Sequence, residues 1–181
     1  MAGANVRLEI GELKKLQKQL EVLNNQTQVN QFFNSCAKEL AARLLAKVIK
    51  RTPVGDYTTE VEVVAKRDSK KHKKGEVYTK KVNKSGKVGG TLRRGWTGGT
   101  NSTAKAYADS LNVNKVGATY MIEMTNPVEY ASYVEFGHRT RNHKGWVEGQ
   151  FMLTISEDEI RNSAPRILQQ KLDAYLKECF K

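Results

Sequence analysis

Apolar side chains recur at helical spacing in three stretches of the chain. In residues 9–23 the stripe consists of Ile10, Leu13, Leu16, Leu20 and Leu23, with lysines and glutamines between them. Such a stripe predicts an amphipathic helix, and Asn24-Asn25 ends it. A second stripe predicts a helix over residues 27–51. It stops at Thr52-Pro53 because proline has no amide hydrogen to donate.

The third stripe predicts a closing helix over residues 149–180, with Pro165 inside it. Two interpretations are open: one continuous helix bent at Pro165, or a second helix capped by Asn162 or Ser163. We favour the continuous helix. The predicted core of the fold contains Leu16, Leu20, Leu40, Leu44, Ile122, Val134, Leu168 and Leu172.

Alternating apolar and polar residues predict short strands. Val61 to Val64 and residues 76–82 form the two arms of a long hairpin, or of a mobile loop, across the Lys- and Gly-rich segment 66–90. Residues 111–114 and 120–125 flank a turn at Val116-Gly117 and predict an antiparallel hairpin. Residues 128–137 predict a short helix, and residues 138–144 a polar loop.

These elements predict an α+β fold in which a small antiparallel β-sheet packs against long N-terminal and C-terminal helices. The 181 residues correspond to a single domain, 1–181, with a basic insertion at about 57–90.

Charge is concentrated in that insertion. The chain has a net charge of +12, yet residues 65–94 hold twelve basic and two acidic side chains, which leaves +2 for the rest. This exceeds what solubility alone requires. The segment is either a solvated loop or an electrostatic arm for DNA or an acidic partner. The arm residues are Lys66, Arg67, Lys70, Lys71, Lys73, Lys74, Lys80, Lys81, Lys84 and Lys87.

Catalytic and cofactor chemistry finds little support in the sequence. His138 and His143 lie in a polar loop without Cys or carboxylate at metal-ligand spacing, so a solvated loop is favoured over a zinc site. The sequence contains no phosphate-binding loop motif and no known motif around a catalytic nucleophile. We therefore expect no enzyme activity, no metal and no cofactor. Cys36 and Cys179 are expected to be buried thiols rather than a disulfide. No apolar run is long enough for a membrane span.

Three fragments occur in order: Thr52-Pro53-Val54-Gly55, the run from Thr91 to Trp96, and the run from Asn126 to His138, which contains Y-A-S-Y-V-E-F-G. Together they resemble the gene-product-ten-like tail-component family of long-tailed bacteriophages, a minor tail protein Z-like or tail-completion group. The resemblance extends over about residues 8–176. Val54 and Leu92 are 38 positions apart, farther than is usual in that family, so the basic segment is an insertion.

The resemblance implies a set of residues that are structurally critical or close to subunit interfaces. Each also has a plain structural interpretation: a helix stop, the core side of a helix, or, for Trp96, a core or interface anchor. Glu135 is expected to pair with Arg93 or Arg94, within a subunit or across a ring. The set is Pro53, Gly55, Leu92, Arg93, Arg94, Trp96, Tyr130, Ala131, Tyr133, Val134, Glu135 and Gly137.

The resemblance implies a structural virion protein at the phage neck that is assembled in the bacterial host cytoplasm. It would form a ring, expected to contain six copies, that completes the tail and joins it to the head connector. Expected partners are the connector or stopper, the tail terminator and the tail tube, with DNA in the bore as an open contact. The alternative is a free nucleic-acid-binding protein that acts through residues 66–94, although no recognition module is present.

Overall fold

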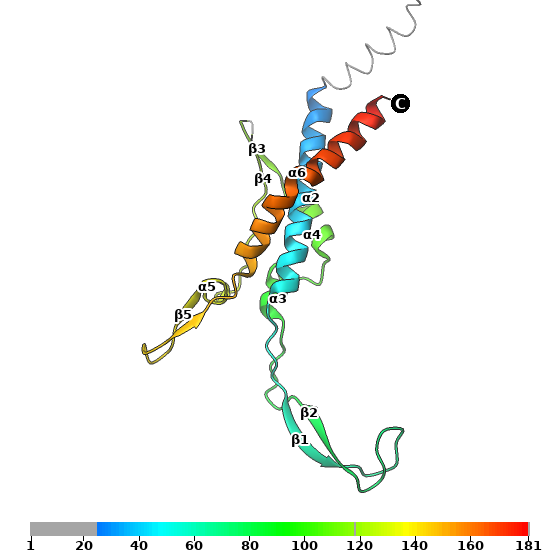
Figure 1. Ribbon diagram of the computed structural model, residues 1–181, viewed down its shortest axis with the longest axis vertical. Helices are drawn as coiled ribbons and strands as arrows, with labels where there is room; N and C mark the ends of the chain where they lie inside the picture. The colour runs from blue at the N-terminus through cyan, green and yellow to red at the C-terminus, as the bar shows by residue number, and fades with distance from the viewer. Residues whose placement is uncertain (1–24, 118, 181) are drawn as a thin grey trace, which may run out of the picture. The chain divides into compact units, whose positions relative to one another are not determined.

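The computed structural model describes residues 25–117 and 119–180 (Figure 1), so the helix predicted over residues 9–23 lies outside the described residues. The chain divides into two compact units. Unit 1 consists of residues 1–50, 102–124 and 151–181, and unit 2 of residues 51–101 and 125–150. The single-domain organisation stays a prediction.

Two long helices, α2 (Gln26–Arg51) and α6 (Met152–Cys179), dominate unit 1. Asn25 caps α2 by accepting a hydrogen bond from the backbone N–H of Thr27 at 3.0 Å. Pro165 lies inside α6, which confirms one continuous helix. Both predicted helices are confirmed to within a few residues at each end.

The two helices pack antiparallel, as contacts at three successive positions along α2 show. Lys47 Nζ lies 2.6 Å from Glu159 Oε2, and Lys171 Nζ donates to the Ser35 carbonyl at 3.3 Å. Near the start of α2, the Phe32 ring lies 4.7 Å from that of Tyr175, centroid to centroid. Figure 1 shows α2 in blue and cyan against α6 in orange and red.

A short helix and a hairpin complete the described part of unit 1. Helix α4 (Ala104–Ser110) was not predicted, although Thr103 caps it by accepting from the Ala106 N–H. Strands β3 (Asn114–Val116) and β4 (Thr119–Met121) pair antiparallel, so the predicted hairpin is confirmed, with both strands shorter and nearer the turn than expected. The hairpin packs on α2 through Tyr120, whose ring stacks on Phe33 and whose hydroxyl donates to Asn30 Oδ1 at 2.6 Å.

The predicted core positions are wrong by about one residue along α2. The buried residues of this helix are Cys36, Ala41, Leu45 and Val48, and burial raises the pKa of the Cys36 thiol. The reason is that the neighbouring elements cover only part of the width of the apolar stripe on α2. The apolar side chains along one edge of the stripe therefore remain partly exposed. Leu40, Leu44, Ile122, Val134 and Leu168 are half-buried, and Leu172 is 38% exposed.

Unit 2 contains a long hairpin, two short helices and a second hairpin. Strands β1 (Thr59–Val64) and β2 (Val77–Val82) form the arm that was predicted, paired from Thr59↔Val82 to Val64↔Val77. Helices α3 (Thr91–Gly95) and α5 (Ala131–Phe136) follow, and then strands β5 (Gly137–Arg139) and β6 (Trp146–Glu148).

The α+β class is confirmed, with one difference. The described strands form three separate two-stranded ribbons rather than one sheet. Within the described residues, no helix combines the length and the hydropathy needed to cross a membrane.

Candidate functional site

Within unit 2, one buried threonine joins the segment before Pro53 to α3 and to Trp96. Thr52 is fully buried. Its hydroxyl oxygen accepts a hydrogen bond from the Trp96 indole N–H at 2.9 Å. Its carbonyl accepts two more from the Arg93 guanidinium, at 2.7 Å from Nη2 and 3.2 Å from Nε. Trp96 is 6% exposed and belongs to the buried core.

The third fragment joins the same site through Asn126. Its side-chain amide donates to the Leu92 carbonyl at 2.9 Å, and its Oδ1 accepts from the Val128 N–H at 3.2 Å. A Cβ on the buried Gly95 would overlap Asn126 Oδ1, so only glycine fits. We call Thr52, Leu92, Arg93, Gly95, Trp96 and Asn126 the motif clamp.

Helix α5 shows an inverted burial pattern. Its buried residue is Glu135, whereas Tyr133 is 58% exposed and Phe136 is 60% exposed. Tyr130, at the N-cap position, is also exposed, and Val134 is half-buried. Large aromatic side chains gathered on a surface mark an interaction site. We call Tyr130, Tyr133 and Phe136 the α5 face.

Several predicted motif residues surround one cleft in unit 2. The cleft has a volume of about 300 Å³, and Pro53 and Gly55 lie across it from Tyr130 and Val134. Leu92 lines it as well and is buried. The structure therefore brings together residues that the sequence separates by about 80 positions.

The ribbon after α5 was missed, because residues 138–144 were predicted to be only a polar loop. Gly137 begins β5 with φ +84°, and a Cβ there would overlap the Val147 carbonyl. The signal was present: a glycine directly after a helix, then two short runs that pair Arg139 with Trp146. Trp146 is 59% exposed.

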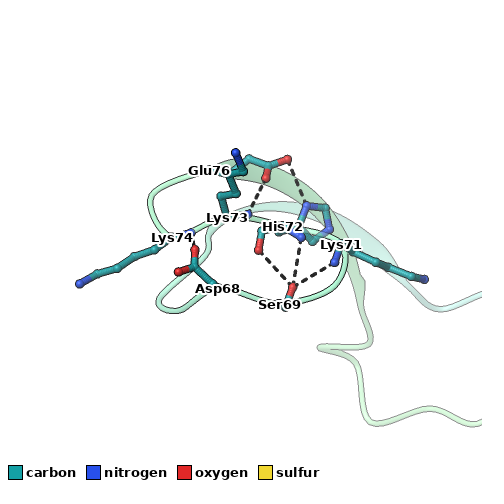
Figure 2. A network of polar contacts seen from close by, with 7 residues as sticks. All are labelled: Asp68, Ser69, Lys71, His72, Lys73, Lys74 and Glu76. Carbon is teal, nitrogen blue, oxygen red and sulfur yellow. Dashed lines mark hydrogen bonds and ion pairs between the residues drawn. The ribbon is translucent and has the colours of Figure 1, made fainter.

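The tip of the arm, residues 65–76, is held by hydrogen bonds of its own rather than being a mobile loop (Figure 2). Asp68 accepts from the Lys74 backbone N–H at 2.8 Å. Glu76 accepts from the Lys73 backbone N–H at 2.8 Å. Ser69 Oγ accepts from the backbone N–H of His72 at 3.1 Å. We call this segment the arm tip.

An aromatic stack joins the arm tip to its stem. The His72 ring lies 4.0 Å from that of Tyr78 with an interplanar angle of 11°, and its Nδ1 is 3.2 Å from Glu76 Oε1. The hydrogen bond from the Lys73 N–H, followed by that from His72, lowers the pKa of Glu76.

The two acids of the basic segment therefore brace the loop. Asp68 and Glu76 point into the tip, while the side chains of Lys71 and Lys74 extend away from it in Figure 2. The acids fix the backbone, and the cations remain exposed. The exposed cations of the tip are Lys66, Arg67, Lys70, Lys71, Lys73 and Lys74.

The other basic residues divide into two groups. Lys80 and Lys81 lie on β2, where Lys81 is opposite Glu60, and Lys84 and Lys87 follow in the return to α3. Arg93 belongs to the motif clamp, and Arg94 Nη1 donates to the Gly89 carbonyl at 3.3 Å. These two arginines hold the fold, so the free charge is concentrated at the arm tip.

A comparison with known families finds a match over most of the chain. The family model described as "Bacteriophage HK97-gp10, putative tail-component" matches residues 14–137, which is more than half of the chain. The chain belongs to this family. It is thus a structural component of the phage tail and part of the virion, as the resemblance implied. No match was found among curated proteins or among solved structures.

The matched region of this tail component includes the motif clamp, the arm and α5, and it ends before β6 and α6. Within the described residues, no three His, Cys, Asp or Glu side chains gather in a way that would hold a metal ion. The polar groups of the clamp are hydrogen-bonded to one another or to the backbone. What the site offers a partner is therefore surface: the α5 face, the cleft and the arm tip.

Proposed function

We propose that this tail component is a tail-completion or tail-terminating subunit of the neck, and that it forms a ring joining the tail to the head connector. The observation that carries the proposal is the α5 face. A short helix that buries its glutamate and exposes Tyr133 and Phe136 is poorly suited to an isolated subunit. It is well suited to contact with a neighbouring subunit, because aromatic side chains anchor interfaces.

A ring places specific demands on that surface. Each subunit of a closed ring presents one patch to the next and a different patch to the previous one. The α5 face and the adjoining cleft beside Tyr130 supply a patch of this kind. We expect six copies in the ring.

The arm tip supplies a second contact, to a polyanionic surface. Its six exposed cations are displayed by a loop whose backbone is already braced by Asp68 and Glu76. Pre-ordering lowers the conformational entropy lost on binding. The partner is DNA in the bore or an acidic face of a neighbouring neck protein.

The ring is tested by changing the α5 face. The double variant Tyr133→Ser, Phe136→Ser should keep the circular dichroism of the wild type and fail to restore head–tail joining in phage that lack the protein. Met121→Ser is the matched control, because Met121 is also exposed but lies on β4 of unit 1. Normal joining by the double variant, or particle density without this protein at the neck, would refute the proposal.

The arm is tested by a salt series on a quadruple variant with glutamine at Lys70, Lys71, Lys73 and Lys74. Binding of the wild type to duplex DNA should weaken with salt, and the variant should reduce the log–log slope by about 3–4, because each phosphate contact contributes about 0.9. The matched control changes Lys84 and Lys87 to glutamine. Purified heads and tails then separate the partners. Loss of joining with unchanged DNA binding identifies an acidic protein, and loss of DNA binding with normal joining favours the free nucleic-acid-binding alternative.

A further inference from the structure

The arm stem, strands β1 and β2, has two open edges. The strands form a two-stranded ribbon, and among the described residues neither strand has a second neighbour (Figure 1). No residue of the two strands, which the structure describes in full, is buried, and Val64 and Val77 are 54% and 61% exposed. A two-stranded hairpin alone is only marginally stable in water, and its outer edges carry backbone groups that can pair with a further strand.

The two edges of the arm stem carry charges of opposite sign. Strand β1 contains Glu60 and Glu62 and no basic residue, whereas β2 contains Lys80 and Lys81 and no acidic residue. All four side chains are exposed. Opposite charges that face each other across two strands stabilise the pairing, and like charges destabilise it. Two β1 edges, or two β2 edges, would therefore repel each other, whereas β1 of one copy attracts β2 of another.

We propose that β2 of one copy pairs with β1 of the next copy, so that the arms of the ring form one continuous antiparallel sheet. The pairing is antiparallel because β1 and β2 run in opposite directions and successive copies keep the same orientation. One acidic and one basic edge per copy give the head-to-tail contact that a closed ring requires. This inference rests on the ring of the proposed function and names a second contact between its subunits.

The charged side chains favour one register between copies. Within a copy, Glu60 lies opposite Lys81, but Glu62 lies opposite the uncharged Thr79. Pairing Glu62 of one copy with Lys81 of the next gives this carboxylate a cationic partner. The register between copies then differs by two residues from the register within a copy. Such a stagger is what closing a sheet into a barrel requires.

The same register keeps the apolar face of the arm stem continuous. The half-buried residues of the two strands lie on one face of the ribbon: Val61, Val63, Tyr78 and Val82. With Glu62 opposite Lys81, Val61 of one copy lies opposite Val82 of the next on that face. A register shifted by one residue would instead bring the apolar face of one copy beside the polar face of the next.

The first test exchanges the charges of the two edges. Variant A, Glu60→Lys with Glu62→Lys, has two basic edges, and variant B, Lys80→Glu with Lys81→Glu, has two acidic edges. Each alone should keep the circular dichroism of the wild type and fail to restore head–tail joining in phage that lack the protein. Co-expression of A and B should restore joining, because the two variants can alternate around a ring of six.

Two further chains control this test. A chain with all four changes has one edge of each sign again and should restore joining. A chain that combines variant A with Lys70→Glu and Lys71→Glu has the same net charge but two basic edges, and it should not restore joining. Joining by A or B alone would overturn the proposal. Rescue by the four-change chain without rescue by the mixture would also overturn it, because the charges would then act only within a copy, and so would failure of both.

The second test detects the pairing directly, in tails purified from cells that produce two versions of the chain with Cys36 and Cys179 changed to Ala. One version carries Val64→Cys and the other Thr79→Cys, positions that lie opposite each other between copies in the proposed register. Mild oxidation should link the two versions into a covalent dimer. Val82→Cys in place of Thr79→Cys is the control. It lies three residues farther along β2 on the other face, and should link at least ten times more slowly.

The outcomes separate this inference from the proposed function. Covalent dimers in tails whose density lacks this protein at the neck would refute the neck function and leave the arm pairing intact. Absence of dimers in tails with a ring of this protein at the neck would overturn the arm pairing and leave the ring to the α5 face.

Discussion

The motif clamp and the arm tip use polar groups in opposite ways. In the clamp, Arg93 and the Trp96 indole donate to Thr52, a fully buried residue. In the arm tip, Asp68 and Glu76 accept from backbone N–H groups that are exposed to water. Buried polar atoms that lose a partner cost free energy because water cannot replace it. At the exposed tip water does replace it, so the two regions should differ sharply in how they tolerate substitution.

The comparison also shows why counting charges along a chain is a poor guide to function. Arg93 and Lys73 belong to the same run of basic residues. The guanidinium of Arg93 bonds with two nitrogens to one carbonyl, while at Lys73 it is the backbone N–H that holds the loop. The side-chain charge is used for folding in the clamp and for display at the tip.

The largest expected loss of stability follows from removing the Trp96 side chain of the motif clamp. Trp96→Ala removes a buried aromatic ring and a hydrogen-bond donor to Thr52, and should lower the free energy of unfolding by about 3–5 kcal/mol. Trp146→Ala is the matched control, because Trp146 is exposed and its loss should cost no more than about 0.5 kcal/mol. Urea denaturation followed by circular dichroism measures both. Similar losses of stability for the two variants would contradict the claim that Trp96 stabilises the fold and Trp146 does not.

A smaller loss of stability is expected when Gly95 of α3, which lies against Asn126, is replaced by alanine. In Gly95→Ala the new Cβ meets Asn126 Oδ1 and lies 2.9 Å from Val128 Cγ2. Such overpacking should cost about 1–3 kcal/mol. Gly145→Ala is the control, since its nearest neighbour is Thr140 Cγ2 at 3.4 Å, an ordinary contact. The same denaturation experiment applies, and a Gly95→Ala variant as stable as the control would show that Asn126 moves aside freely.

Removing the arm should leave the rest of the chain almost as stable as before. Replacing residues 60–81 by Asn-Gly joins Thr59 directly to Val82, its antiparallel partner, through a favourable hairpin turn. Loop-closure entropy changes by only about 0.6 kcal/mol per doubling of length, so the thermal midpoint should shift by no more than a few degrees. Polyanion binding should be lost. A large drop in the midpoint would mean that the arm contributes to the core.

The smallest expected effect is a local loss of hydrogen bonding in the arm tip at low pH. Because hydrogen bonds lower the folded-state pKa of Glu76, its bracing is complete above the ordinary glutamate pKa of about 4.3. It is lost as the pH falls through the lower, folded-state value. The protection of the Lys73 amide, measured relative to its intrinsic exchange rate at the same pH, should therefore fall as the pH drops below the ordinary glutamate range, without global unfolding. Glu76→Gln should show the reduced protection already at neutral pH, and a wild-type protection that does not change with pH would contradict the bracing.

The sequence predicted the parts of this protein that depend on neighbours along the chain. The stripe of α2, its stop at Thr52-Pro53, the continuous α6 and the pairing of β1 with β2 follow from periodicity and from proline, which act locally. The family assignment was also available, because the three fragments occur in a fixed order. The short helices α3 and α4 and the ribbon β5–β6 were missed because each is too short to show a period.

The tertiary structure alone decided what each of those residues does. Periodicity gives the direction of an apolar stripe but not how much of its width a neighbour covers. The buried residues are therefore Cys36, Ala41 and Leu45 rather than the predicted Leu40 and Leu44, and one edge of the stripe lines a groove. Likewise, the sequence does not say that Trp96 meets Thr52 or that α5 turns Glu135 inward. These depend on contacts between residues far apart along the chain, whose free energies no local pattern records.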